Sequence, residues 1–292
     1  MTTLRYELKT MSDDTAALPS LDLTEISAGL VHPGSLWREV RVVAETGSSN
    51  ADLLAAAVAS AAEGTVLVAE AQNAGRGRLG RCWASPPRAG LTFSVLLRPA
   101  GVPAVLLGWL PLLAGVAAAA SVRAVAAVDA TLKWPNDVLA GEKKLGGILA
   151  ERSGTAVVVG IGINVWQARA DLPPDAAATS LALAAGAAAT GPGLRERLLA
   201  GLLDELGRWY LAWRDQAAPG DADACGLRDE YARRCATLGR EVTVTMPGTE
   251  PVTGTATGVD GAGRLEIRTA AGLVAVTAGD VVHVRPVNEA GY

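Results

Sequence analysis

Short apolar runs and helix-length patterns alternate along the first two thirds of the chain. The runs rich in Val, Leu and Ile predict β-strands at Val40–Ala44, Thr65–Ala69, Gly90–Arg98 and Ala156–Val165. The last of these is almost continuously apolar, which predicts a central strand buried on both faces. An Ala-rich stretch and two amphipathic stretches predict helices over residues 51–62, 194–216 and 226–236. Mixed helices and strands indicate an α/β (α+β) domain.

The pattern changes at both ends of the chain. From Gly239 onward, short β-type runs are interrupted by glycines at regular intervals, which predicts a small antiparallel barrel. Residues 1–36 are polar and irregular, with no apolar stretch of signal-peptide type, and are too short and acidic for a helix-turn-helix DNA-binding unit. We therefore expect an irregular tail at 1–36, a catalytic domain at 37–236 and a barrel domain at 237–292.

One apolar stretch is long enough to raise the question of a membrane span. No charged residue stands between Arg98 and Arg123. Three prolines interrupt this stretch, and it ends in the small residues Ala117–Ser121. A buried helix is therefore the preferred interpretation.

Composition narrows the possible functions. The chain has 292 residues, half of them apolar, and a net charge of −4, which supports a large core and argues against a general nucleic-acid or anionic-membrane surface. Three cysteines without metal spacing indicate reduced thiols and a cytoplasmic protein. With only His32 and His283 present, histidine-based catalysis and multi-histidine metal sites are not expected.

The most distinctive stretch is a loop rich in arginine and glycine. Gly75-Arg-Gly-Arg-Leu-Gly-Arg81 places three glycines and three arginines within seven residues, directly after a predicted strand. Glycine lets the backbone approach a ligand closely, and arginine forks suit phosphate and carboxylate groups. We expect an anion-binding loop that is mobile until its ligand arrives.

Two better-known glycine motifs do not account for this loop. Its letters fit the dinucleotide fingerprint G-x-G-x-x-G, but that motif opens a helix, whereas this chain continues into Pro86-Pro87. The P-loop requires Lys and Ser/Thr where this chain has Arg81 and Cys82. The remaining alternative is a solvated charged loop, and the downstream motifs argue against it.

Lysines gather at a second informative region. Only four of the 26 basic residues are lysines, and three of them, Lys133, Lys143 and Lys144, lie within twelve residues. Lys133-Trp-Pro-Asn-Asp137 places an ammonium and an indole before a turn, followed by an amide and a carboxylate. Lys144 precedes Gly146-Gly147, and Gly160 and Gly162 interrupt the buried strand, as expected if something lies against its backbone.

Together these stretches resemble the biotin–protein ligases. The resemblance rests on the loop 75–81, Lys133-Trp-Pro-Asn-Asp137, Lys144-Leu-Gly-Gly-Ile-Leu-Ala-Glu151 and Gly160-Ile-Gly-Ile-Asn164, with support from Ser48-Ser-Asn50 and Gln72. It is strong from about Arg38 to Asn164 and weak beyond. It implies a mixed-sheet catalytic domain like the class II aminoacyl-tRNA synthetase/biotinyl-lipoyl ligase fold, an SH3-like C-terminal barrel, and the ligase-only type without an N-terminal DNA-binding domain.

The resemblance also implies residue roles. Biotin would be bound by Ser48, Ser49, Asn50, Gln72, Gly75, Arg76, Arg78, Lys144, Gly147, Gly160 and Gly162. ATP or the adenylate would be bound by Arg78, Arg81, Trp83, Lys133, Asn136, Asp137, Lys144, Asn164 and Arg285, with Trp83 or Trp134 as the residue that stacks on adenine. Catalysis would depend on Lys144, Arg78 and Asp137.

The implied reaction is the activation of biotin by ATP to biotinyl-5′-AMP, followed by transfer to a lysine of a biotin carboxyl carrier protein. Mg²⁺ would be carried mainly by the ATP phosphates, with no separate protein metal site, and the protein would be a monomer or weak homodimer. Two alternatives stay open. A lipoate–protein ligase shares this chemistry, although its Arg-Arg-x-Ser-Gly-Gly-Gly motif is missing. A biotinyl-adenylate-sensing regulator is the non-enzymatic alternative.

Overall fold

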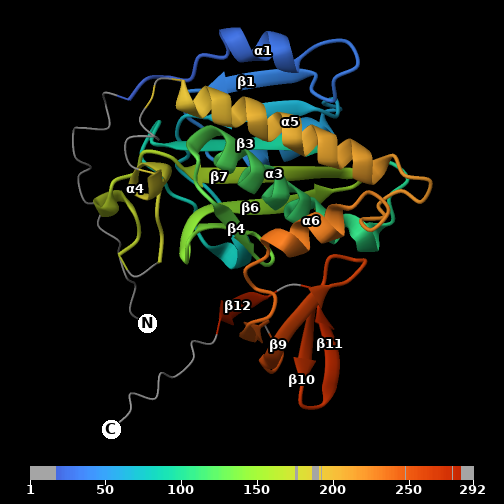
Figure 1. Ribbon diagram of the computed structural model, residues 1–292. Coiled ribbons are helices and arrows are strands. Elements are labelled where there is room, and N and C mark those ends of the chain that lie inside the picture. Colours follow the sequence, from blue (N-terminus) through green and yellow to red (C-terminus); the bar gives the residue numbers. More distant parts are fainter. Residues whose placement is uncertain are drawn as a thin grey trace, which may run out of the picture.

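A computed structural model describes residues 18–174, 177–185, 191, 193–246, 248–277 and 279–283. Seven strands form the main sheet in the order β1-β2-β3-β7-β6-β5-β4 (Figure 1). Their bounds are β1 Glu39–Val43, β2 Thr65–Ala69, β3 Gly90–Leu97, β4 Ala130–Lys133, β5 Asp137–Ala140, β6 Lys143–Ser153 and β7 Ala156–Asn164. Only β1 and β2 run parallel among these neighbours, and all other pairs are antiparallel. The mixed sheet expected from the sequence is confirmed.

Strand β7 lies at the centre of the sheet and is buried on both faces, as its apolar sequence predicts. Its side chains alternate between two cores because the side-chain period of a strand is two. Val157, Val159 and Ile161 belong to the large core on one face. Val158 lies on the other face, in a small cluster with Leu53 and others.

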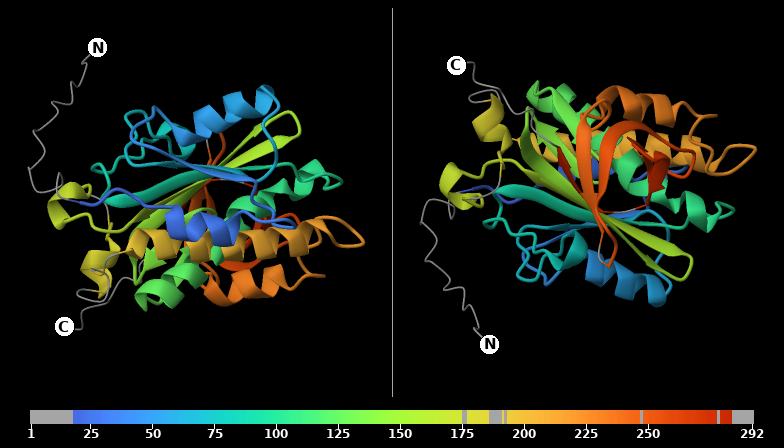
Figure 2. Two further views of the ribbon diagram at one scale, coloured as in Figure 1. Left: turned by 90° about the horizontal axis from the view of Figure 1, so that it is seen from above. Right: turned by 90° about the horizontal axis from the view of Figure 1, so that it is seen from below.

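Helices cover the two faces unequally (Figures 1 and 2). The helices α3 (Trp109–Ala126), α5 (Leu194–Arg214) and α6 (Leu227–Arg234) lie on one side, and α2 (Ser49–Val58) lies on the other. Shorter elements are η2 (Arg78–Gly80), η3 (Ala104–Gly108), η4 (Arg169–Asp171) and α4 (Leu181–Ala185). Residues Ala104–Ala126 are long and apolar enough to cross a membrane, but 67% of an 18-residue apolar stretch within them is buried inside the fold. This agrees with the core helix that the sequence predicts.

The C-terminal strands form a second sheet in the order β11-β10-β9-β8-β12. They span β8 Glu241–Thr245, β9 Val252–Val259, β10 Leu265–Thr269, β11 Gly272–Val276 and β12 Asp280–His283. Two indoles join this sheet to the main domain: Trp109 Nε1 donates to the Gly261 carbonyl at 2.9 Å, and Trp134 Nε1 donates to the Gly263 carbonyl at 3.1 Å. The Trp134 side chain is buried at this junction.

The N-terminal segment is more ordered than its polar sequence predicts. Helix α1 (Thr24–Leu30) forms inside the stretch expected to be irregular, and Leu21 and Leu30 reach the large core. A fully buried ion pair, Arg195 to Glu70 at 2.5 Å, holds this segment, because Leu21 N donates to Glu70 Oε1 at 2.6 Å. These partners lie far apart in the sequence, so local composition did not reveal them.

One titrating group lies between the two domains. Burial, with the nearby cations Lys133 and Arg240, lowers the pKa of His283 on β12 to about 4. In the unfolded chain a histidine titrates near 6.5, so the unfolded state binds more protons between these values. Stability is therefore lost as the pH falls from about 6.5 toward about 4.

We expect His283→Gln to reduce this loss. The midpoint of thermal unfolding, measured between pH 7 and 4.5, should fall less steeply for the variant than for the wild type. Parallel curves for the two proteins would mean that His283 does not contribute.

Candidate active site

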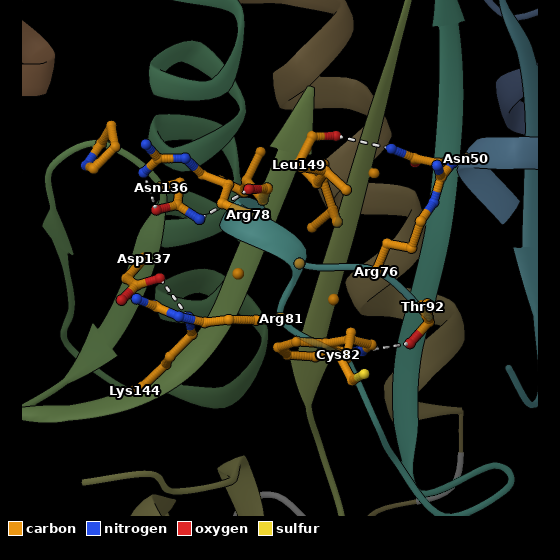
Figure 3. A pocket seen from close by; sticks show the side chains of 18 of the residues that line it. Asn50, Arg76, Arg78, Arg81, Cys82, Thr92, Asn136, Asp137, Lys144 and Leu149 are labelled. Carbon is orange, nitrogen blue, oxygen red and sulfur yellow. Dashed lines mark hydrogen bonds and ion pairs between the residues drawn. The ribbon is translucent and has the colours of Figure 1, made fainter. Parts of the chain in front are cut away.

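The site lies on the α2 face of the sheet, where apolar side chains give way to small and polar ones. Moving along β3 on this face, Leu96 is followed by Ser94 and then Thr92. Along β7, Val158 is followed by Gly160 and Gly162. A cavity of about 330 Å³ opens here (Figure 3), within the size range of small-molecule sites.

The glycines of the central strand admit two protein side chains. A Cβ on Gly160 would lie 2.2 Å from Asn50 Oδ1, and a Cβ on Gly162 would lie 2.4 Å from the Trp83 ring. The Trp83 indole also lies beside Gly147 and donates to Thr92 Oγ1 at 3.4 Å. The two glycines led us to expect another group packed against the backbone of this strand, and the side chains of Asn50 and Trp83 lie there. They form the floor of the cavity.

The start of α2 supplies neutral hydrogen-bonding groups. Ser48 is the N-cap of this helix, and its hydroxyl accepts from Ala51 N at 3.4 Å. Gln72 Oε1 accepts from Ser49 N at 2.8 Å and from Ser49 Oγ at 2.9 Å. The cap therefore leaves Ser49 and Asn50 to face the cavity.

The Arg/Gly loop lies beside the cavity, and each of its three arginines contacts another part of the protein. Arg76 pairs with Glu151 at 3.1 Å, Arg78 donates to Asn136 Oδ1 at 3.0 Å, and Arg81 pairs with Asp280. Arg78 also donates to the Gly279 carbonyl at 3.5 Å. The loop thus spans the gap between the main sheet and β12.

Gly75 does not line the cavity, and its backbone packs against the backbone of Trp83 instead. A Cβ there would lie 2.2 Å from the Trp83 carbonyl oxygen, and Trp83 N donates to the Gly75 carbonyl at 2.9 Å. Glycine is required because the two backbone segments approach so closely.

Cations gather at the opposite end of the cavity from Asn50 (Figure 3). Lys144 Nζ lies 2.5 Å from Asp137 Oδ1, and Lys133, Arg78 and Arg81 also line this end. Burial lowers the pKa of Arg78 and of Lys133, because desolvation disfavours the charged form. A bound anion would relieve that cost, so this end is suited to phosphate and carboxylate groups.

Most of the site residues expected from the sequence line this one cavity. They are Ser48, Ser49, Asn50, Gln72, Arg76, Arg78, Arg81, Trp83, Lys133, Asn136, Asp137, Lys144, Gly147, Gly160 and Gly162. Asn164 does not: it is buried, and its amide donates to the Thr179 carbonyl at 2.9 Å and accepts from Gln167 at 3.2 Å. Arg285 lies outside the described residues.

The sequence did not indicate several other parts of the site. Thr92 on β3 and the strand β12 residues Asp280, Val281 and Val282 also line the cavity. The alternation Thr92, Ser94, Leu96 could have identified the β3 face, whereas nothing local to β12 indicates its approach to the loop. Within the described ranges, no group of three or more His, Cys, Asp or Glu side chains could hold a metal ion.

Comparisons with known proteins agree with this geometry. Residues 44–165 match the Biotin/lipoate A/B protein ligase family, and residues 237–284 match the Biotin protein ligase C terminal domain. The chain is 45% identical to the biotin–[acetyl-CoA-carboxylase] ligase of Mycobacterium tuberculosis, over 94% of this chain and 100% of that protein. It is 32% identical to the ligase of the same name from Paracoccus denitrificans, over 82% of this chain and 98% of the relative.

A solved structure is also similar. The biotin protein ligase from Aquifex aeolicus in complex with biotin and ATP superimposes with a TM-score of 0.70 at 29% identity, covering 85% of this chain and 100% of that one.

Proposed function

This chain belongs to the biotin protein ligase family and is a ligase, and we propose that it joins biotin to a lysine of a biotin carboxyl carrier protein in two steps at the cavity described above. The observation that carries the proposal is the polarity of the cavity. One end offers the neutral groups of Ser48, Ser49 and Gln72 beside Arg76, whose charge is paired with Glu151, and the other offers four cations, with the Trp83 floor between them. Biotin has the same layout, with a polar ureido ring at one end and a carboxylate at the other.

We propose that Ser48, Ser49, Gln72 and Arg76 bind the ureido group. Fixed donors and acceptors discriminate strongly against a ligand that leaves them unpaired. The dithiolane ring of lipoate has no hydrogen-bond donor or carbonyl, so it would leave this end of the cavity unsatisfied. The polar end therefore favours biotin over lipoate.

In the first step the biotin carboxylate attacks the α-phosphate of ATP and pyrophosphate leaves. A carboxylate is already ionised at neutral pH, so the step needs no general base. What it needs is two anions held together and stabilisation of the charge that develops on phosphorus. We assign this task to Lys144, with Arg78, Arg81 and Lys133 on the phosphates, Asn136 positioning the nucleotide and Trp83 stacking on adenine.

Mg²⁺ would be held mainly by the ATP phosphates. The carboxylates that line the cavity belong to Asp137 and Asp280, and each is paired with a cation. This set of donors suits an ion that keeps phosphate and water as ligands. When bound, the ion would neutralise charge on the phosphates.

In the second step the acceptor lysine attacks the mixed anhydride and AMP leaves. An exposed lysine with a pKa near 10.4 is almost entirely protonated at pH 7, so a group must accept its proton. We assign this role to Asp137, whose carboxylate is released when Lys144 turns toward the anions. We further propose that the enzyme acts in the cytoplasm as a monomer or weak homodimer, without nucleic-acid or membrane partners.

The test is incubation with labelled biotin, ATP, Mg²⁺ and a carboxyl-carrier domain. We expect one labelled lysine on the carrier, and no label when that lysine is replaced by arginine. Equal use of lipoate would favour the lipoate ligase instead. DNA binding without any label transfer would favour the regulator.

A further inference from the structure

Glu151 on β6 lies outside the cavity lining, yet its carboxylate contacts two groups that reach the cavity. Its Oε2 accepts from Asn50 Nδ2 at 2.8 Å, and its Oε1 pairs with Arg76 at 3.1 Å. Asn50 comes from the start of α2, and Arg76 comes from the Arg/Gly loop. The Glu151 side chain is 25% exposed, so its contacts are only partly screened by water.

The contact with Glu151 fixes the orientation of the Asn50 amide. Asn50 Nδ2 donates one proton to Glu151. It donates the other to the Leu149 carbonyl at 3.1 Å, a contact that Figure 3 shows. The carbonyl Oδ1 must therefore face Ser94, whose hydroxyl donates to it at 2.6 Å. Gly160 makes room for this arrangement, because any Cβ there would meet Asn50 Oδ1.

The number of protons on each group sets the direction of the hydrogen bonds, and this extends the influence of Glu151 from Asn50 to the ligand end of the cavity. Ser94 has one hydroxyl proton, and Asn50 accepts it. Ser94 therefore cannot donate at its 2.7 Å contact with Ser49, and the single Ser49 proton is shared between Ser94 Oγ and Gln72 Oε1, the latter at 2.9 Å. Both of these acceptors belong to the protein, so the lone pairs of the Ser49 oxygen are left to accept from a ligand. A ureido N–H is the group that such an acceptor binds.

We propose that Glu151 is a positioning residue that sets the direction of the hydrogen bonds from Asn50 through Ser94 to Ser49, and that it thereby makes Ser49 an acceptor for a ureido N–H. Its pairing with Arg76 holds the loop at the same end of the cavity. A reversed Asn50 amide would turn the Ser94 proton toward Ser49, where it would occupy a lone pair of the Ser49 oxygen that otherwise accepts from the ligand. This inference rests on the proposed function, because it takes biotin as the ligand.

The test compares Glu151→Leu with Glu151→Gln. Leucine removes both contacts, and we expect the KM for biotin to rise about tenfold, the loss typical of one hydrogen bond to a charged group, while the KM for ATP changes less than twofold. Glutamine keeps an oxygen that can accept from Asn50, so its KM for biotin should stay within about threefold of the wild type. Glu205→Leu, which removes the exposed pair with Arg208, is the control.

The outcomes separate the possible explanations. If the wild type shows no biotin-dependent pyrophosphate release, the proposed function itself is wrong. If the wild type is active and Glu151→Leu has an unchanged KM for biotin, the positioning role is wrong. A lower unfolding temperature with equal changes in both KM values would show a merely structural role, and it would also overturn the proposal.

Discussion

Lys144→Ala is expected to lower the rate of biotin-dependent pyrophosphate release by about 10³-fold or more, while the affinity for biotin weakens far less. Lys144 Nζ lies at the cationic end of the cavity, 2.5 Å from Asp137, where the two reacting anions must meet. A fixed cation at the point where charge develops contributes most in the transition state. Pyrophosphate release and equilibrium biotin binding, measured on the same preparation, separate these two effects.

Lys144→Arg is expected to fail as well, since Lys144 packs between Asp137 and Gly147, whose added Cβ would lie 3.5 Å from Nζ. A planar fork does not fit where one compact ammonium fits. The matched control is Lys143→Ala, which removes the exposed neighbouring lysine and should leave the rate unchanged. If Lys144→Ala keeps most of the wild-type rate of pyrophosphate release, Lys144 has no part in the mechanism.

Arg78→Gly is expected to activate biotin to some extent but to release the adenylate at least about tenfold faster than the wild type. Arg78 ties the loop to Asn136 and to the Gly279 carbonyl of the second sheet, so its loss opens one side of the cavity. A closed loop protects a hydrolysable anhydride from water. The adenylate released early would label lysines on bystander proteins.

The dissociation rate of preformed biotinyl-adenylate, measured by dilution, tests this prediction. Arg152→Gly is a suitable control because that exposed arginine on β6 donates to the Gly154 carbonyl at 2.8 Å and does not line the cavity. Equal dissociation rates for the wild type and Arg78→Gly would show that the loop is a static anion site rather than a closure.

Local patterns were sufficient for much of the fold. The run Thr65–Ala69 forms β2 with the same bounds, and the apolar run from Ala156 forms the central strand. These elements depend on side-chain periodicity, which the sequence carries directly. The site residues were instead predicted from the resemblance of the motifs to a known family, because side-chain periodicity does not indicate which residues bind a ligand.

The sequence was less informative where contacts join distant segments. Arg81 and Asp280 are 199 positions apart, and nothing near either residue indicates their pairing. Helix α1 is held through the buried Arg195–Glu70 pair, which composition alone does not show. Asn164 follows a glycine motif and was expected at the nucleotide, but its amide pairs with Thr179 and Gln167 instead.

The most direct test of acyl-adenylate formation is to identify the nucleotide products without an acceptor protein. Purified enzyme is mixed with ATP and Mg²⁺, with and without biotin, and products are followed by mass spectrometry. We expect AMP-containing biotinyl-adenylate and pyrophosphate, formed in amounts near the enzyme concentration and only when biotin is present. ADP and phosphate, or pyrophosphate release that does not depend on biotin, would contradict the proposed function of this cavity.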